Sequence, residues 1–375
     1  MQIFKTICHG TGRFRYPEDL CPRSRRVKLT LVARKSQTLV ISVVIAILLI
    51  SALALVLRGR LRCSGFAGPE VTLADLPPAA ADDVLRIVSW NVRNFPLDER
   101  PQDSNLGYSR RTNICDLEVV LAGLDADLLG LQEVNDTRRF PPILRRAVEG
   151  RQMGVRFSTG GGRFGQHLAI AWDTEVLELV DEPFDIADVV FEPGMRPAYA
   201  ARFRSRTHPG LDFTFIVVHW ESGRGGFDDR RRQNRALAAW IDHWVEEIGD
   251  PDVVAVGDFN TAGSPRGGTD GELQSIDAIL GVAGLERLAN TTGCSQYWEG
   301  SGNRDGIQRS SLLDHVFLRG LSADNLAAPV QAWLHCARFE CADLVSRPGA
   351  EDGTFWDVSD HCPLTFELMA GGIAD

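Results

Sequence analysis

The sequence predicts an α/β fold, and three observations lead to this class. Between residues 85 and 368, short apolar runs alternate with longer stretches of helical periodicity. Carboxylate, carboxamide and imidazole side chains stand where several of these apolar runs end. The composition, with 44% hydrophobic and 24% charged residues, is typical of a globular protein that can bury a sizeable core.

Seven segments are predicted to be strands and four to be helices. The strands are residues 85–90, 127–132, 168–172, 214–219, 253–257, 313–318 and 364–368. The helices are residues 110–124, 141–148, 228–248 and 273–280.

The predicted helix 228–248 has apolar residues at spacings of three and four, which indicates one face packed on the core. Asp228 is suited to cap its first turn. Of the early arginines, all but one are expected to face solvent rather than phosphate: Arg230, Arg231, Arg232 and Arg235.

Residues 38–57 are the most apolar part of the chain. These twenty residues carry no charge and, at about 1.5 Å rise per residue, would cover roughly 30 Å of hydrocarbon as a helix. We predict a single transmembrane helix. A cleaved signal peptide is the alternative, but its apolar part is usually about 7 to 15 residues long, and 37 residues precede this segment. Six nearby cationic residues before it, against three after it, favour a cytoplasmic N-terminus.

These features divide the chain into four parts. Residues 1–37 are predicted to form a basic cytoplasmic segment, 38–57 the transmembrane helix, 58–83 a linker, and 84–370 the folded domain, exported from the cytoplasm. Beyond residue 62 stand 28 of the 40 basic residues and 48 of the 50 acidic ones, so the exported part carries a net charge near −20. This balance argues against tight nonspecific binding to polyanions.

Six of the eight cysteines follow the apolar segment, and an oxidising compartment could pair this even number. Cys294, Cys336 and Cys341 are the better disulfide candidates, whereas Cys362 is interpreted as a buried free thiol. A metal site made of sulfur ligands is not expected, because the chain has no close Cys-x-x-Cys pair.

Acidic and amide side chains follow two predicted strands. Glu133 comes after the apolar residues 128–131, and Asp258 comes directly after 253–257. A period of two places Asp258 and Asn260 on one side of the chain, where both could converge on one phosphate. Either motif alone could be a surface or turn feature. Their oxygen atoms are nevertheless the ligands that magnesium prefers.

Two histidines and another aspartate complete the pattern. His219 ends the apolar run 213–218, Asp314 stands at the edge of an apolar strand, and His361 lies in a Ser-Asp-His-Cys-Pro motif. Imidazole can act as an acid or a base near neutral pH. A neighbouring carboxylate would orient it and stabilise its charged form.

Taken in order, these motifs resemble the endonuclease/exonuclease/phosphatase superfamily over about residues 85–368. They are Trp90-Asn91-Val92-Arg93, Leu131-Gln132-Glu133-Val134, Val218-His219, Gly257-Asp258-Phe259-Asn260, Leu313-Asp314-His315 and Ser359-Asp360-His361-Cys362-Pro363. The resemblance implies a four-layer α-β-β-α sandwich of two packed mixed sheets, here preceded by one transmembrane helix. It also implies metal-assisted attack of water on a phosphate ester in a single step.

The resemblance further implies a metal site. Glu133 would be a metal ligand, with Asn91 and Asp360 nearby in the metal and phosphate environment. The expected cofactor is Mg²⁺, with Mn²⁺ or Ca²⁺ as alternatives.

The other matched residues are implied to be catalytic. Asp258 and Asn260 would orient the water and the phosphate. His361, with Asp314 as its partner, would activate the water or bind the phosphate, and His219 would serve the leaving group.

The chain departs from the superfamily pattern in two places. Deoxyribonuclease-like members have an acidic partner for the leaving-group histidine just before the position of Leu168, where this chain has Gln166 and His167. Exported bacterial members carry His-Leu-Lys-Ser-Gly, whereas this chain has Trp220-Glu221 after its histidine and so lacks that cation.

The leading interpretation is a membrane-tethered, exported, metal-dependent phosphodiester hydrolase, with nucleic acid as the expected substrate and no protein partner. A lipid or small-molecule phosphodiesterase or phosphatase on the same fold is the alternative. A binding domain without activity is a third interpretation. The sequence does not distinguish DNA, RNA and lipid.

The predicted topology can be tested with a reporter fused after Asp375. Because the flanking charges favour an exported C-terminal part, we expect a reporter that works only outside the cytoplasm to be active. Activity of a cytoplasm-specific reporter at the same position would contradict this orientation.

Overall fold

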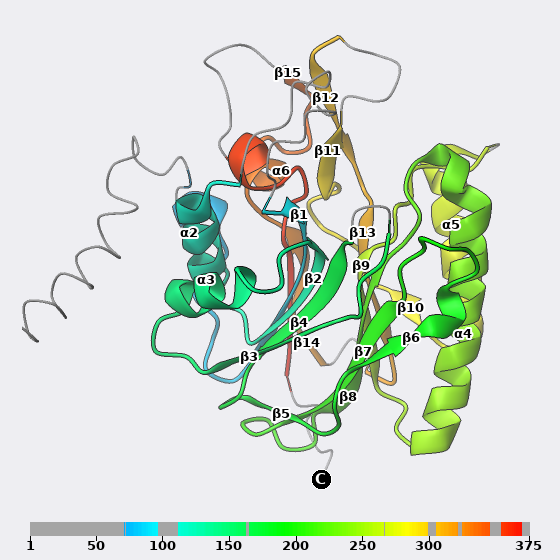
Figure 1. Cartoon of the computed structure of the whole chain (residues 1–375), viewed down its shortest axis with the longest axis horizontal. Coiled ribbons are helices and arrows are strands. Elements are labelled where there is room, and N and C mark those ends of the chain that lie inside the picture. The colour runs from blue at the N-terminus through cyan, green and yellow to red at the C-terminus, as the bar shows by residue number, and fades with distance from the viewer. Residues whose placement is uncertain are drawn as a thin grey trace, which may run out of the picture. The chain divides into compact units, whose positions relative to one another are not determined.

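The computed structural model describes residues 71, 73–96, 112–162, 165–265, 267–298, 305–321, 325–345 and 354–369. These residues belong to one compact unit, Ala67–Asp375. Two mixed sheets lie at its centre, with helices on both outer sides (Figure 1). The predicted α/β class and the packing of two mixed sheets are therefore confirmed.

The described helices include none that is long and apolar enough to cross a membrane. The predicted transmembrane helix 38–57 and the basic segment 1–37 lie outside the described residues, as does most of the predicted linker.

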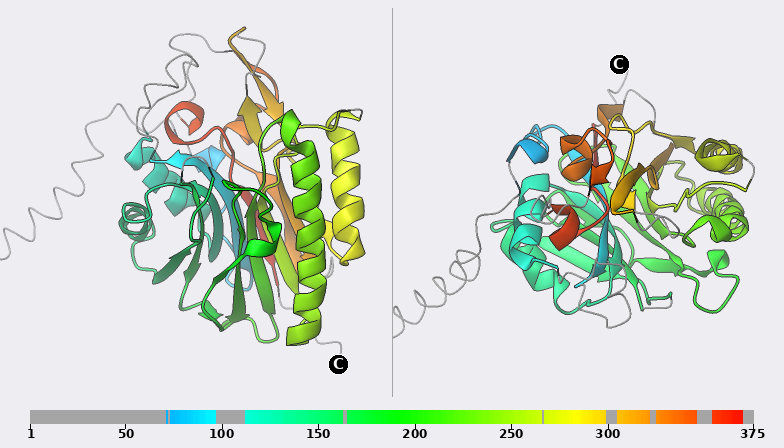
Figure 2. Two further views of the ribbon diagram at one scale, coloured as in Figure 1. Left: turned by 45° about the vertical axis from the view of Figure 1, so that its right-hand side comes forward. Right: turned by 90° about the horizontal axis from the view of Figure 1, so that it is seen from above.

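The first sheet has six strands in the order β14-β16-β1-β2-β4-β3. Its strands are β1 (Leu85–Phe95), β2 (Leu128–Val134), β3 (Met153–Phe157), β4 (His167–Asp173), β14 (Leu326–Ala332) and β16 (Leu364–Leu368). β1 and β2 are parallel, and the other neighbours are antiparallel. The helices α2 (Ile114–Leu124) and α3 (Phe140–Ala147) cover its outer face (Figure 2). Asn113 caps α2 through its side-chain oxygen.

The second sheet follows the order β10-β13-β9-β8-β7-β5, and β6 also pairs with β7. Its strands are β5 (Leu177–Leu179), β6 (Phe184–Ile186), β7 (Ala198–Ser205), β8 (Asp212–His219), β9 (Val253–Asp258), β10 (Glu286–Arg287) and β13 (Asp314–Arg319). β8 and β9 are parallel. The helices α4 (Phe227–Ile248) and α5 (Gly268–Val282) cover this sheet.

Smaller elements complete the described region. β11 (Gln296–Trp298), β12 (Ile307–Ser311) and β15 (Leu344–Val345) form a three-stranded sheet beyond one end of the large sheets (Figure 1). The short helical segments are Leu73–Asp75, Ala187–Val189, Arg224–Gly226, α6 (His335–Arg338) and a π-helical turn at Thr354–Val358.

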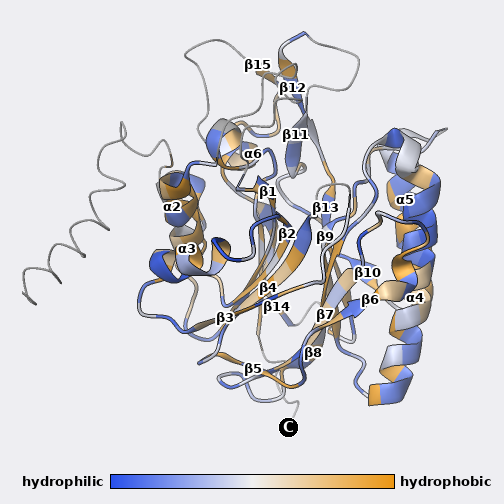
Figure 3. Ribbon diagram, viewed as in Figure 1, coloured by the Kyte–Doolittle hydropathy of each residue, from blue (hydrophilic) through white to orange (hydrophobic). Residues whose placement is uncertain are grey.

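Three buried apolar clusters fill the spaces between the layers. The largest lies between the two sheets, the second joins the first sheet to α2 and α3, and the third joins the second sheet to α4 and α5. The central strands are accordingly mostly apolar, while polar and apolar residues alternate on α4 and α5 (Figure 3). This pattern is the one expected of strands buried on both faces and of helices buried on one.

All seven predicted strands and all four predicted helices are present, although their ends differ by a few residues. Asp228 is not the cap of α4, because the helix begins at Phe227 after Gly226 and has no side-chain cap. Arg230 is buried and forms an ion pair with Glu272 (2.7 Å), so it neither faces solvent nor is free to meet phosphate, an outcome that the prediction for these arginines did not include.

The interpretation of Cys362 as a free thiol is wrong. It is bonded to Cys336, and Cys294 is bonded to Cys341. Cys115 is disulfide-bonded as well. The free-thiol prediction failed because the sequence did not reveal that α6 brings Cys336 against Cys362, just before β16.

Glycine is required at two close approaches near the end of the core. A Cβ on Gly257 would lie 2.1 Å from the carbonyl oxygen of Val218, and its φ of 140° disfavours other residues. A Cβ on Gly130 would lie 2.9 Å from side chains of Val217 and Val256 in the opposite sheet. These glycines let neighbouring strands and the two sheets approach closely where the polar residues begin.

Candidate active site

One end of the core between the sheets changes from apolar to polar. His219, Asp258 and Asp314 continue the rows of buried side chains that β8, β9 and β13 contribute to this core. Asn91 does the same in β1. Because side chains alternate along a strand, the rows that build the core also bring these four polar groups together.

Glu133 reaches the same place by a different route. It belongs to the row of Leu129 and Leu131, which faces α2 and α3. Its backbone is left-handed, with φ of 63°, which breaks the strand alternation. Its Oε2 accepts a hydrogen bond from the backbone of Asn94 (2.8 Å), and its Oε1 lies 3.6 Å from Nε2 of His219.

Asn91 and Asp360 surround Glu133 with further oxygen atoms. The side chain of Asn91 hydrogen-bonds Glu133 and donates to Oδ2 of Asp258 (3.1 Å). Burial raises the pKa of Glu133, and the negative charge of Asp360 raises it further. Such mutual repulsion disfavours an all-ionised cluster unless a cation is present.

Asp258 lies at the centre of the polar groups. Its carboxylate is 3.5 Å from Nε2 of His219 and 3.7 Å from Nε2 of His361. Burial raises the pKa of Asp258 to about 7, with Asp314 and Glu133 adding to the rise and His361 opposing it. A carboxyl group with this pKa can exchange a proton near neutral pH.

His361 and Asp314 form a close pair. Nδ1 of His361 lies 2.8 Å from Oδ2 of Asp314, and both residues are buried. Burial acts to lower the pKa of His361, but the charges of Asp314, Asp258 and Asp360 outweigh it and raise the pKa to about 10. His361 is therefore a cation at neutral pH.

His219 has the opposite electrostatic environment. Burial, Arg196 and His361 lower its pKa well below the usual value, so the ring is neutral. Its Nε2 faces Glu133 and Asp258, while its buried Nδ1 has no hydrogen-bond partner among the described residues.

Arg196 is a site residue that the sequence analysis missed. Its guanidinium donates to the carbonyl oxygens of His219 (3.0 Å) and Trp220 (2.8 Å) and to Oε1 of Gln166 (2.6 Å). Gln166 also donates to Asn94 (2.8 Å). Gln166, which stands where deoxyribonuclease-like members have an acidic partner for the histidine, thus binds Arg196 and not His219. Arg196 precedes β7 in a loop, so strand periodicity gave no signal for it.

The prediction that a period of two places Asn260 beside Asp258 is wrong, because the strand does not continue to Asn260. β9 ends at Asp258, and Asn260 adopts a left-handed conformation with φ of 51°. The turn, and not strand alternation, brings the two together: the backbone of Asn260 donates to Oδ1 of Asp258 (2.9 Å), and its Nδ2 donates to the carbonyl oxygen of Trp220 (3.1 Å).

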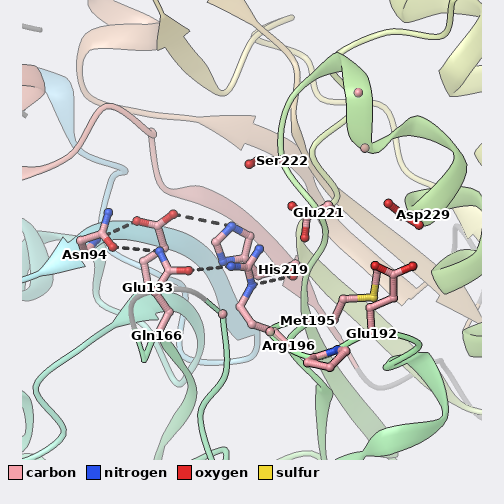
Figure 4. A pocket seen from close by; sticks show the side chains of 15 residues that line it. Asn94, Glu133, Gln166, Glu192, Met195, Arg196, His219, Glu221, Ser222 and Asp229 are labelled. Carbon is pink, nitrogen blue, oxygen red and sulfur yellow. Dashed lines mark hydrogen bonds and ion pairs between the residues drawn. The ribbon is translucent and has the colours of Figure 1, made fainter.

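A pocket of about 850 Å³ opens beside Glu133 and His219 (Figure 4). Among the described residues that line it, acidic side chains outnumber the cationic one, Arg196. The acidic ones are Glu133, Glu192, Glu221 and Asp229. The pocket therefore joins Glu133 and His219 to a polar, mainly acidic wall.

The donor chemistry fits a hard divalent cation. Glu133, Asp360 and Asn91 offer oxygen ligands, which magnesium, manganese and calcium accept. Ligand atoms of Asp258, Asp314 and His361 also lie within 4.8 Å of one another. Within that second group, however, His361 and Asp314 already bind each other, so the oxygen set at Glu133 is the better metal site.

The sequence pattern of the Endonuclease/Exonuclease/phosphatase family matches residues 88–361, which span every residue of the site described above. The chain belongs to this family. Its members are hydrolases that act on phosphoester bonds, and they generally use divalent metal ions.

Solved structures with a similar fold include TDP2 from Caenorhabditis elegans, at 16% identity and a TM-score of 0.51, over 80% of this chain and 77% of that one. The human Nocturnin catalytic domain has 16% identity and a TM-score of 0.49, over 80% and 99%. A mannosyl-6-phosphatase from Bacteroides thetaiotaomicron has 19% identity and a TM-score of 0.47, over 76% and 99%. No curated protein sequence matches this chain. At these identities the likeness concerns the fold alone.

The pairing of Asp314 with His361 predicts non-additive losses of activity. His361→Ala should lower kcat by about 10²- to 10⁴-fold, since it removes a charged donor at the reaction centre. Asp314→Asn should lower kcat by a smaller factor, and the double variant should match His361→Ala, because residues that act as one unit do not add. Hydrolysis of bis-p-nitrophenyl phosphate measures kcat, and circular dichroism checks the fold.

Asp277→Asn is the matched control, because this partly exposed carboxylate pairs with Arg287 on the surface. It should retain the activity of the wild type. If the losses of the two single variants multiplied in the double variant, Asp314 and His361 would be acting independently.

Proposed function

We propose that this chain is a membrane-tethered, exported, magnesium-dependent phosphodiester hydrolase that cleaves by direct attack of an activated water. The convergence of Glu133, Asp258 and His361, from segments far apart in the sequence, carries the proposal. Strongly shifted pKa values from burial and like charges, next to a pocket, are typical of catalytic sites.

Glu133, Asp360 and Asn91 would hold the Mg²⁺ ion. When bound, the ion supplies positive charge that neutralises phosphoryl oxygens and promotes the ionisation of water. Asn91 has a second function in this scheme, because its hydrogen bonds to Glu133 and Asp258 link the metal site to the reaction centre.

The pKa directions divide the proposed catalytic work between Asp258 and His361. A group with a pKa of about 10 is a poor base at neutral pH, so His361 would donate a hydrogen bond to a phosphoryl oxygen. Asp258, with a pKa of about 7, would accept a proton from the attacking water, while Asn260 helps to orient the phosphate.

His219 would serve the leaving oxygen. It lines the pocket, and its backbone carbonyl oxygen accepts a hydrogen bond from Arg196. A neutral imidazole can donate one N–H to the leaving oxygen while its other nitrogen accepts. Arg196 adds positive charge close to the departing group.

Membrane tethering and export rest on the sequence. The uncharged residues 38–57 and the larger number of cations before them support one transmembrane helix with the enzyme outside the cytoplasm. Disulfides in the folded domain agree with an oxidising compartment, because such bonds rarely persist in the cytosol.

Hydrolysis by the purified full chain in detergent tests the proposal. Plasmid DNA, RNA, sphingomyelin and bis-p-nitrophenyl phosphate should be assayed with Mg²⁺ and with chelator, and we expect turnover of at least one substrate only with the metal. Glu133→Gln should raise the Mg²⁺ concentration needed for half-maximal activity, by about tenfold or more for loss of a charged ligand.

Glu246→Gln, on the exposed face of α4, is the control and should leave the Mg²⁺ requirement unchanged. Full activity in chelator, or no hydrolysis of any of the four substrates, would refute the proposed function.

Nucleic acid remains the substrate class that the sequence resemblance implies. The acidic wall of the pocket favours a second candidate, a small phosphodiester or phosphomonoester with a hydroxyl-rich or cationic substituent. Carboxylates attract such groups and repel the flanking phosphates of a polynucleotide. Glu221 is the residue of this wall to test first. It occupies the position of the lysine in the His-Leu-Lys-Ser-Gly pattern of exported bacterial members of the superfamily.

The charge of residue 221 should therefore change the choice of substrate. Glu221→Arg is expected to lower kcat/KM for p-nitrophenyl phosphorylcholine relative to bis-p-nitrophenyl phosphate by about fivefold or more, since two unit charges about 4 Å apart in water interact by about 1 kcal/mol. The same variant should cleave an oligonucleotide faster than the wild type. Glu246→Arg is the control for added surface charge. An unchanged substrate ratio in Glu221→Arg would exclude Glu221 from substrate selection.

A further inference from the structure

Two disulfides join a short segment, residues 336–341, to residues near the Asp314–His361 pair. Cys336, in α6, is bonded to Cys362, and Cys341, just after α6, is bonded to Cys294. Cys362 directly follows His361 in the sequence. The segment 336–341 is therefore covalently tied to the residues just before β11 and just before β16.

Ser295, next to Cys294, connects the backbones on both sides of the Asp314–His361 pair. Its Oγ accepts hydrogen bonds from the N–H groups of Leu313 and Asp314 (3.0 Å each). Its carbonyl oxygen accepts from the N–H of Cys362 (2.8 Å). Ser295 is fully buried, so water does not compete for these bonds.

The next residues of β11 extend this connection to the catalytic loop. The N–H of Tyr297 donates to the carbonyl oxygen of Asp360 (3.0 Å), and Gln296 forms a β-bridge with His361. β11 therefore runs beside the loop that carries His361, and its hydrogen bonds hold this loop at a defined position relative to Asp314.

The segment that bears the disulfides is itself in an uncommon conformation. Glu340 and Cys341 are consecutive residues other than glycine with φ of 49° and 59°. Left-handed backbone is unfavourable for residues with a Cβ, and it persists where the surrounding structure imposes it. The Cys294–Cys341 bond provides such a constraint.

We propose that Ser295 and the two disulfides position Asp314 against His361, so that full turnover requires both disulfides to be formed. The two catalytic residues are 47 positions apart in the sequence, and their hydrogen bond is 2.8 Å long. A displacement of about 1 Å would break it, and misplacement of this size can cost about 10²-fold in rate. The inference rests on the proposed hydrolase function.

The alternative is that these disulfides only stabilise the fold, by restricting the unfolded chain. In that case their removal would lower the melting temperature and leave kcat unchanged below it. If the disulfides position the pair, their loss lowers kcat by more than an equal loss of stability elsewhere in the chain does. A variant that is destabilised to the same extent at a remote position therefore separates the two roles.

The test compares four variants of the full chain. Two lack one disulfide each, Cys336→Ala/Cys362→Ala and Cys294→Ala/Cys341→Ala. Ser295→Ala keeps both disulfides and removes the Oγ acceptor. Leu177→Ala is the control: this buried residue of β5 pairs with Ser205, at the end of the sheet remote from His219, and its truncation destabilises the core without touching the site.

Two readouts are needed. The first is kcat and KM with bis-p-nitrophenyl phosphate and Mg²⁺, below the melting temperature of each variant. The second is the low-field NMR resonance of the His361 Nδ1–H, assigned by its loss in Asp314→Asn. The resonance reports the geometry of the pair whether or not the chain turns over a substrate.

We expect kcat to fall about 10- to 100-fold in the three site variants, with KM within about twofold, and the resonance to weaken or disappear. Leu177→Ala should keep both. Retention of wild-type kcat and of the resonance in the disulfide variants would overturn the proposal. If those variants do not fold, Ser295→Ala decides in the same way. If the wild-type protein shows the resonance but hydrolyses no phosphoester, the proposed function is refuted. The positioning role is then tested by the resonance alone, which should still weaken in the three site variants.

Discussion

Burial of several carboxylates around Asp258 is the constraint on which the rest of the site depends. The side chains of Glu133, Asp258 and Asp314 are 15%, 3% and 2% exposed. Buried negative charges this close are costly unless cations and donors surround them. His361 and Arg196 supply part of the positive charge, but the raised pKa values of Glu133 and Asp258 show that repulsion and desolvation are not fully offset. This residual imbalance is what a bound divalent cation would relieve, and it distinguishes the cluster from a self-sufficient ion-pair network.

The packing of the two sheets determines where this cluster forms. Rows of apolar side chains from β8, β9 and β13 hold the sheets together, and the same rows end in His219, Asp258 and Asp314. Gly130 allows the sheets to approach just before that end. The positions of His219, Asp258 and Asp314 are therefore a consequence of core packing, and a change of strand register would move these three side chains away from one another.

Sequence periodicity was sufficient to predict the strands and helices that are long or uniformly apolar, and to identify the polar residues at the ends of these strands. It did not predict short or half-polar strands such as β7 and β14, whose residues do not form a continuous apolar run. Arg196 and the disulfide of Cys362 were missed because loops and covalent pairings depend on contacts between distant segments. Asn260 was placed correctly for the wrong reason, since a left-handed turn had no signature in the alternation that was used.

Two parts of the site follow different physical rules. The proposed reaction centre combines groups at strand ends with His361 in a loop, and Ser295 and two disulfides link the backbone around it. The pocket wall is built from loops and the first turn of α4, which carry Glu192, Glu221 and Asp229. Loop charges can change without disturbing the core. In the proposed hydrolase, the bond that is broken would be set by the buried groups, whereas the choice of substrate would depend on the charge of the wall, which disfavours a polyanion.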